Sequence, residues 1–225
     1  LRLVNAMLDL SKLEAGKMEL NLIQGDVINF IRYIVESFHS VAESQEKKMH
    51  YLSALDQMYV KYDEEKLRQI VSNLLSNALK FTSKKGDIYI SITIDNQSQL
   101  VIKVKDTGKG ISESQIHFIF DRFYQADTTV TRNAEGTGIG LALTKELVQL
   151  MDGEISVKSP PIGSKIGTEF TVTLPLEFIS DFAEKPERSH FKEKDNVRFD
   201  KTQSVENIDS LNKINTDKPL ILLVE

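Results

Sequence analysis

Cysteine is absent from the 225-residue sequence, which excludes a disulfide framework, a thiolate nucleophile and any cysteine-ligated metal centre. Histidine is scarce, since the four histidines are scattered and none has a partner at the spacing of a helical zinc motif. The apolar runs stay far short of the ~20 residues that span a bilayer. No N-terminal signal pattern is present either, so we expect a soluble, intracellular protein.

The sequence also lacks a strong excess of charge of either sign. Lys and Arg total 28 against 33 for Asp and Glu, which leaves a net charge of −5. Nucleic-acid-binding domains usually carry a strongly basic surface, so we expect no direct contact with nucleic acid. Hydrophobic residues make up 40% of the chain, which is enough for a core at this length.

Glycine is missing from the end of the chain, because all 11 glycines lie between Gly16 and Gly167. From Asp181 to Pro219 charges of both signs are mixed with scattered apolar residues. Such a composition cannot bury enough apolar surface to fold by itself, so we interpret this stretch as a linker. The apolar run Leu220–Val224 and the following Glu225 are typical of a buried parallel strand that belongs to a further domain.

The beginning of the chain has the pattern of an amphipathic helix. Leu1, Val4 and Leu8 recur at helical spacing, the pattern runs through Glu14, and Gly16 follows as a C-cap. A lone helix of this length is marginal in water, so we expect a partner helix upstream of it. The expected boundaries are the end of a helix over 1–16, a complete domain over 17–178, a linker over 179–218 and a truncated strand over 219–225.

Between these ends the sequence changes repeatedly between helical and strand patterns. Periodicity predicts helices from Asp26 to about Glu46, from Asp63 to Phe81, and over Gly138–Met151. It predicts strands over His50–Ser53, Met58–Tyr62, Asp87–Ile94, Leu100–Lys105, Glu154–Ser159 and Thr168–Leu174. Strands that are grouped with helices on one face indicate the α+β class, as a two-layer α/β sandwich.

The helix predicted over 63–81 carries a polar stripe beside its apolar face. Asn73, Asn77 and Lys80 are spaced i, i+4 and i+7, so they lie along one edge of the helix. Such a stripe is most often a solvated flank. Amide oxygens beside a lysine can also ligate Mg²⁺ while the ammonium group holds a phosphate. The motif alone leaves both interpretations open.

Two glycine-rich segments and an aromatic cluster follow along the chain. Asp106–Ile111 comes after a strand and is either a turn or a loop where a planar base approaches the backbone and hydrogen-bonds the carboxylate. Gly136–Leu141 leads into a helix with G-x-G-x-G spacing, which is neither a P-loop nor a Rossmann fingerprint but suits an anion. Ile119–Tyr124 is more typical of a core, or else it anchors the polar segment that follows.

In this order the motifs resemble the catalytic ATP-binding domain of sensor histidine kinases, within the gyrase, Hsp90, histidine kinase and MutL superfamily. NLLSNALKF is similar to the N box, DTGKGI to the G1 box, IFDRFY to the F box, GTGIGL to the G2 box, and Gly167–Phe170 to the last glycine box. Residues 1–16 resemble the end of a second dimerisation helix, and PLILLVE resembles the first strand of a receiver domain. The resemblance implies the Bergerat ATP-binding fold with a mixed sheet, in a hybrid kinase.

The resemblance also implies which residues bind the nucleotide base. Asp106 receives the adenine amine, Thr168 lies nearby and contacts the base through water, and Phe81 lies along the adenine ring. Backbone N–H groups of the G2 box face the phosphates. The remaining members of the implied nucleotide-binding set are Gly108, Gly110, Ile111, Gly136, Thr137, Gly138, Gly140 and Leu141.

Asn73, Lys80 and Arg122 form the implied catalytic set. Asn73 ligates Mg²⁺, Lys80 holds a phosphate oxygen, and Asn77 contacts the phosphate region. Gln125 stands where some relatives carry an arginine that reaches the terminal phosphate, so another cation has to make that contact. The candidates for it are Arg132 and Lys109.

Asn73 also bears on the kind of ATP chemistry. The hydrolytic relatives place a glutamate general base at this position, and an amide cannot accept a proton from water at neutral pH. The resemblance therefore favours phosphoryl transfer to a neutral histidine nitrogen, as in two-component signal transduction. The alternatives are an ATPase or serine-kinase regulator of the same superfamily, and a nucleotide-binding pseudokinase scaffold.

The phosphoacceptor is expected outside this chain, because none of the four histidines is followed by an acidic residue. His117 borders the F box and is interpreted as a surface or supporting residue. The implied partners are a histidine-containing dimerisation domain of the same protein, in cis or in trans, a receiver domain, and a second copy in the full-length homodimer. ATP and Mg²⁺ are the implied cofactors, in the cytoplasmic portion of a membrane-anchored sensor.

Overall fold

The computed structural model describes residues 2–125 and 137–179. All of them belong to the first of two compact units, Leu1–Ala183. The expected linker and receiver strand lie outside the described residues, so their boundaries stay predictions. No helix in the described ranges is both long and apolar enough to cross a membrane.

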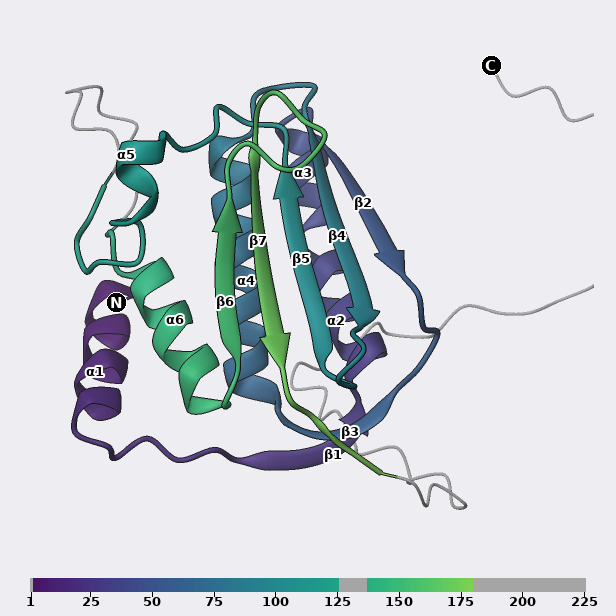
Figure 1. Ribbon diagram of the computed structural model, residues 1–225, viewed down its shortest axis with the longest axis vertical. Helices are drawn as coiled ribbons and strands as arrows, with labels where there is room; N and C mark the ends of the chain where they lie inside the picture. The colour runs from purple at the N-terminus through teal and green to yellow at the C-terminus, as the bar shows by residue number, and fades with distance from the viewer. Residues whose placement is uncertain (1, 126–136, 180–225) are drawn as a thin grey trace, which may run out of the picture. The chain divides into compact units, whose positions relative to one another are not determined.

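The centre of the domain is a five-stranded mixed sheet in the order β2-β4-β5-β7-β6 (Figure 1). Its strands are Lys48–Ser53 (β2), Asp87–Ile94 (β4), Leu100–Asp106 (β5), Glu154–Lys158 (β6) and Thr168–Leu174 (β7). β2 pairs with β4 in parallel, and the other neighbours pair antiparallel. On β4, Ile88, Ile90 and Ile92 are fully buried between more exposed residues, which confirms the half-buried strand predicted from the alternation.

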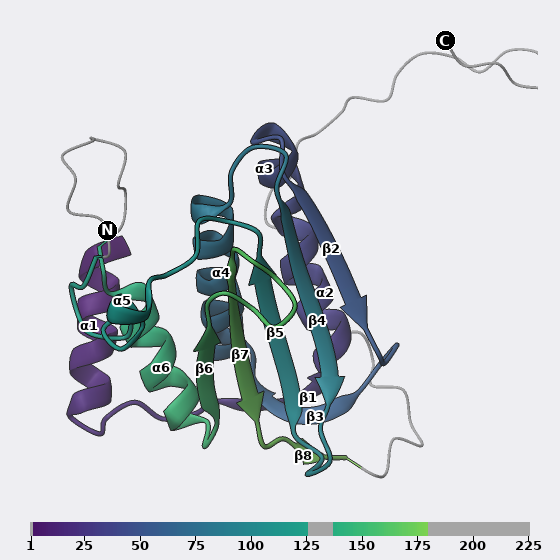
Figure 2. The ribbon, with the colours of Figure 1, turned by 45° about the horizontal axis from the view of Figure 1, so that its top comes forward.

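Helices α2 (Val27–Ser37), α4 (Glu64–Phe81) and α6 (Gly140–Leu150) cover one face of this sheet (Figure 2). α4 lies between the other two and contacts both. Asp63 begins α4 by accepting a hydrogen bond from the Lys66 N–H at 3.0 Å. One stripe of α4 is fully buried: Leu67, Ile70, Val71, Leu74 and Leu75. The sheet and its helical layer confirm the predicted α+β sandwich.

The prediction of one continuous helix from Asp26 to about Glu46 is wrong, because this segment forms two helices. Asp26 begins α2 as expected, since its carboxylate accepts hydrogen bonds from the first helical N–H groups. The chain then divides at Phe38, and a second helix, α3 (His39–Ser44), follows. The Phe38 N–H bonds the Val35 carbonyl, three residues back instead of four, which tightens the turn and separates the two helices.

A second, smaller sheet has the strand order β1-β3-β8. Its strands are Leu22–Asp26 (β1), Tyr59–Asp63 (β3) and Glu177–Phe178 (β8). The strand predicted over Met58–Tyr62 corresponds to β3 with a shift of one residue. β1 was not predicted, because its first residues are exposed and its strand form comes from antiparallel pairing with β3.

Helix α1 (Arg2–Glu14) packs beside α6, and the short helix α5 (Glu113–Ile116) precedes the F box (Figure 1). Gly16 follows α1 at φ +61°, and the Lys17 N–H bonds the Lys12 carbonyl, so the predicted C-cap is confirmed. α1 contacts α6, and the partner helix expected upstream stays a prediction. The exposed apolar residues of α1 are Val4, Met7 and Leu8.

Candidate functional site

Asp106 is the last residue of β5 and is only 5% exposed. Its Oδ1 accepts a hydrogen bond from the Gly108 N–H at 2.8 Å, and it stands opposite Thr168 in the β5–β7 register. Burial raises the pKa of the Asp106 carboxyl, while backbone hydrogen bonds at Gly108 and Thr168 act in the opposite direction. The strand end therefore holds a buried carboxylate beside a buried threonine.

The loop after Asp106 lies directly on the end of helix α4. A Cβ on Gly108 would collide with the carbonyl oxygen of Phe81, the last residue of α4. Only glycine lets the two backbones approach so closely. The G1 and N boxes, which are distant in the sequence, meet at this point.

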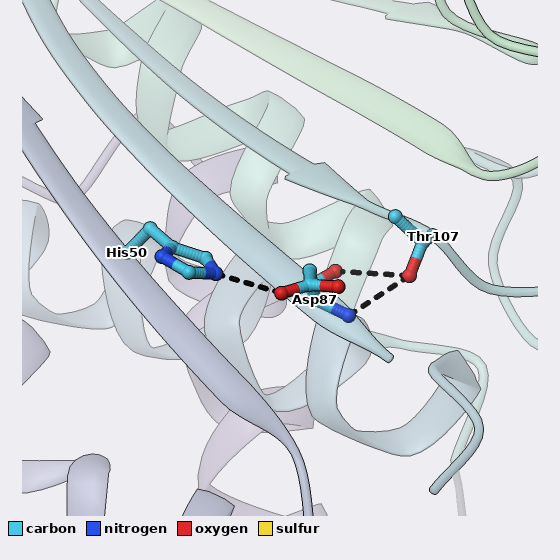
Figure 3. Close-up of polar contacts among 3 residues, drawn as sticks. All are labelled: His50, Asp87 and Thr107. Carbon is cyan, nitrogen blue, oxygen red and sulfur yellow. Dashed lines mark hydrogen bonds and ion pairs between the residues drawn. The ribbon is translucent and has the colours of Figure 1, made fainter. Parts of the chain in front are cut away.

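Thr107 ties the same loop to the beginning of β4 (Figure 3). Its hydroxyl accepts a hydrogen bond from the Asp87 N–H at 2.9 Å and donates to the Asp87 carbonyl at 3.3 Å. The Asp87 carboxylate in turn lies 2.7 Å from Nε2 of His50, on the neighbouring strand β2. The residue next to Asp106 is thus held by the sheet.

Ser159 holds the other side of the loop and was missed by the sequence analysis as a site residue. Its hydroxyl accepts a hydrogen bond from the Ile111 N–H at 2.7 Å and donates to the Gly167 carbonyl at 2.7 Å. A Cβ on Gly110 would lie 3.0 Å from the same hydroxyl oxygen. Ser159 follows β6 and carries no motif, so only the structure reveals that it joins two of the predicted boxes.

Asn73 lies in the middle of α4 and contacts the first turn of α6. Its Nδ2 donates a hydrogen bond to the Thr144 hydroxyl at 2.7 Å, and that hydroxyl donates to the Gly140 carbonyl at 3.0 Å. A Cβ on Gly140 would collide with Oδ1 of Asn73. The N and G2 boxes are therefore in direct contact, and no side chain in the described chain caps the beginning of α6.

Two lysines flank the exposed ring of Phe81 at the end of α4. The Lys80 Nζ lies 5.0 Å and the Lys109 Nζ 5.3 Å from the ring centroid. Asn77 is partly buried one turn before Phe81 on the same helix. The predicted polar stripe of α4 therefore ends at a cationic, aromatic corner beside the G1 loop.

The F box contacts both the G2 turn and the sheet. The Phe123 N–H donates a hydrogen bond to the Gly138 carbonyl at 2.9 Å, and the Phe120 ring meets Phe170 of β7 edge to face at 6.4 Å. The Ile139 N–H lies 3.4 Å from the Thr137 hydroxyl. Gly136 and Arg132, which were also predicted, lie outside the described residues.

Arg122 was predicted as a catalytic cation, and the structure pairs it with an acidic residue of α1. Its Nη1 forms an ion pair with Glu14 Oε1, and both side chains are partly exposed. The F-box arginine thus joins the end of α1 to the segment that follows α5. His117 is exposed, as predicted.

The family model for the histidine kinase-, DNA gyrase B- and HSP90-like ATPases matches residues 62–178, which include all three glycine boxes, α4 with its N box, and β7. The chain belongs to this ATPase family. Its mixed sheet with helices on one face agrees with that of solved histidine kinases.

Two curated relatives that resemble this chain are named as histidine kinases, and a solved structure also resembles it. Sensor histidine kinase WalK of Bacillus subtilis is 38% identical over 79% of this chain and 28% of WalK. Hybrid signal transduction histidine kinase D of Dictyostelium discoideum is 34% identical over 78% of this chain and 11% of that protein. Full-length ShkA, crystallised with AMPPNP, has a TM-score of 0.68 and 27% identity over 79% of this chain and 36% of ShkA. The chain thus spans less than a third of each curated relative.

The described residues offer few side chains that could ligate one metal ion together. In the described ranges, no three Asp, Glu or His side chains converge as a metal site. Among the described residues, the Asn73 carboxamide oxygen lies against Gly140 at the junction of α4 and α6, and an amide oxygen is a hard ligand.

Proposed function

We propose that this chain contains the catalytic ATP-binding domain of a sensor histidine kinase, which transfers the terminal phosphoryl group of ATP to a histidine on another helix. The main support is one arrangement of residues. A buried carboxylate, Asp106, lies at one end of the site. A carboxamide, Asn73, lies against the first residue of α6, a helix that no described side chain caps. In such a site Asp106 could accept a hydrogen bond from an adenine amine. The beginning of α6 could bind a phosphate group, and Asn73 could ligate a metal ion bound to that phosphate.

In the proposed complex Asp106 accepts a hydrogen bond from the adenine amine, and Thr168 lies beside it. The loop of Gly108, Gly110 and Ile111 packs closely against the end of α4 and against Ser159, and Thr107 and Ser159 keep that loop in place beside Asp106. Phe81 borders the base.

The phosphates would lie at the beginning of α6. Free backbone N–H groups and the helix dipole favour negative charge at a helix N-terminus. Gly140 and Leu141 are the first residues of this helix, and Thr137 and Gly138 precede them. Lys80 and Asn77 would contact the phosphates from α4, and Lys109 is the described candidate for the terminal phosphate. Mg²⁺, when bound, would neutralise phosphate charge, with Asn73 as its protein ligand.

The chemistry proposed is in-line phosphoryl transfer. The bond from the terminal phosphorus to the bridging oxygen of ATP breaks, a bond to a neutral imidazole nitrogen forms, and ADP leaves. Asn73 cannot serve as the general base that water attack requires. A neutral imidazole needs no such base, so orientation and charge neutralisation carry the reaction.

The proposal includes the context of the chain within a longer protein. Residues 1–16 would be the end of a dimerisation helix, 17–178 the catalytic domain, 179–218 a linker and 219–225 the beginning of a receiver domain. The hybrid kinase among the relatives supports this organisation. The partners would be the histidine-bearing dimerisation domain, the receiver domain and a second copy, at the cytoplasmic side of a membrane.

The test is incubation with γ-labelled ATP and Mg²⁺, with and without a separate dimerisation domain that carries an acceptor histidine. We expect label on the added domain only, and a matched domain with the histidine replaced by glutamine should stay unlabelled. Stable label on this chain alone would contradict an external acceptor. Steady phosphate release without any acceptor would favour the ATPase alternative. ATP binding with neither transfer nor steady release would favour the nucleotide-binding scaffold.

A further inference from the structure

The Thr144 hydroxyl has one proton and two hydrogen-bond neighbours. Thr144 lies one turn into α6, is 2% exposed, and donates its proton to the Gly140 carbonyl at 3.0 Å. In this arrangement the proton points at the Gly140 carbonyl and is not directed at Asn73. Towards Asn73, at 2.7 Å, the hydroxyl oxygen can therefore act only as an acceptor.

This constraint decides the orientation of the Asn73 carboxamide. Its NH₂ group has to face Thr144, since an amide oxygen there would meet another acceptor. Oδ1 then lies on the side of Gly140: a Cβ on this glycine would collide with Oδ1 but would stand 3.2 Å from Nδ2. The oxygen of the side chain is thus presented at the beginning of α6.

We propose that Thr144 is a positioning residue, which holds the Asn73 carboxamide so that its oxygen, and not its NH₂ group, meets a divalent cation bound with ATP. This inference rests on the proposed function. The two ends of an asparagine amide have almost the same shape but opposite hydrogen-bonding character, so packing alone does not select between them. A cation tolerates only the oxygen.

Valine and serine at position 144 separate the role of the hydroxyl from that of the side-chain volume. Thr144→Val keeps the branched shape and removes the acceptor, which leaves the Asn73 NH₂ group without its partner. Thr144→Ser keeps the hydroxyl and loses only a methyl group. If Thr144 acts through packing, Thr144→Ser should lose more of the effect of Mg²⁺ on ATP affinity. If Thr144 positions Asn73, Thr144→Val should lose more of it.

The experiment is calorimetric titration of ATP into wild type and both variants, once with Mg²⁺ and once with a chelator. We expect metal-free ATP to bind all three proteins similarly. The gain in affinity on adding Mg²⁺ should fall about tenfold in Thr144→Val, as loss of one hydrogen bond implies, and should persist in Thr144→Ser. Equal losses with and without Mg²⁺ would overturn the inference.

A second measurement needs no nucleotide and stays informative if Thr144→Val does not fold. NMR of the Asn73 side-chain amide in the wild-type protein should show its protons close to Thr144 and protected from exchange, and Thr144→Ser should retain this protection. Freely exchanging amide protons would overturn the inference. If wild type showed no gain in ATP affinity with Mg²⁺, the proposed metal site would fail, while the NMR result would still decide the orientation of Asn73.

Discussion

At the scale of the single residue, Asp106 is a carboxyl group that can carry a negative charge and yet lies buried, where a charge is unfavourable. Its carboxyl group is buried at a strand end, and the loss of water around it raises its pKa. The folded state therefore holds the proton more tightly than the unfolded state does. The contribution of Asp106 to stability is largest below the ordinary aspartate pKa and is lost as the pH rises through the raised pKa. A buried group of this kind is typical of a binding site.

The first prediction concerns Asp106→Asn without nucleotide. Asparagine can still accept the Gly108 hydrogen bond but carries no charge, so the variant should gain thermal stability over wild type at neutral pH. The gain should shrink towards pH values at which Asp106 is protonated. Melting curves of both proteins across acid and neutral pH measure it, and Asp56→Asn, at an exposed position, is the control for the charge change. A gain that does not depend on pH would contradict the assigned cause.

The second prediction concerns Ser159→Ala, which removes the acceptor of the Ile111 N–H and the donor to Gly167. Leaving a partly buried N–H unpaired should destabilise the domain by about 1 kcal/mol, or roughly 2–4 °C in melting temperature, and should weaken ADP binding. Ser164→Ala is the matched control, because the Ser164 hydroxyl bonds Ile166 in the same loop and is exposed. Equal effects of the two substitutions would show that Ser159 does not hold the G1 loop.

The residue types of the site could be predicted, but the contacts between them could not. Asp106 and Asn73 belong to motifs whose chemistry is visible in the sequence. Thr144 contacts Asn73, and Ser159 contacts Ile111, across long separations in the chain, and neither has a motif of its own. Such contacts depend on how α6 and β6 pack on the rest of the domain.

At the scale of elements, the best-predicted segments were those whose burial is periodic. β4 and β7 agree to the residue with the alternation in the sequence, and α4 has both a capping aspartate and a clear apolar stripe. β1 was missed because its strand form depends on pairing with β3. The division between α2 and α3 was missed because no proline or glycine marks the tightened turn at Phe38.

The third prediction concerns the attachment of α1 to the F box through Glu14 and Arg122. Both side chains are partly exposed, so their coupling in a double-mutant cycle of Glu14→Gln and Arg122→Gln should be roughly 0.2–1 kcal/mol. Urea unfolding measures the coupling, which should fall at roughly 1 M salt. Glu19→Gln, at an exposed position beyond α1, should show no coupling to Arg122→Gln. Zero coupling of Glu14 at low salt would contradict a contact that holds the helix.

At the scale of the whole molecule, the predicted boxes gather around the ends of a few packed elements. The end of α4, the end of β5 and the loop before β7 meet at the G1 loop, while the middle of α4 meets the beginning of α6. Residues spread over the family match at 62–178 thus form one region of the domain. We propose that this region binds an adenine nucleotide through Asp106.

Calorimetric titration of ADP and GDP into wild type, Asp106→Asn and the exposed control Asp56→Asn tests that claim most directly. Guanine presents an oxygen where adenine presents its amine, so wild type and the control should bind ADP more tightly than GDP. Loss of a hydrogen bond to a charged group is worth about 1.5–3 kcal/mol, so Asp106→Asn should weaken ADP binding about 10- to 150-fold. Unchanged ADP affinity in Asp106→Asn would contradict the account.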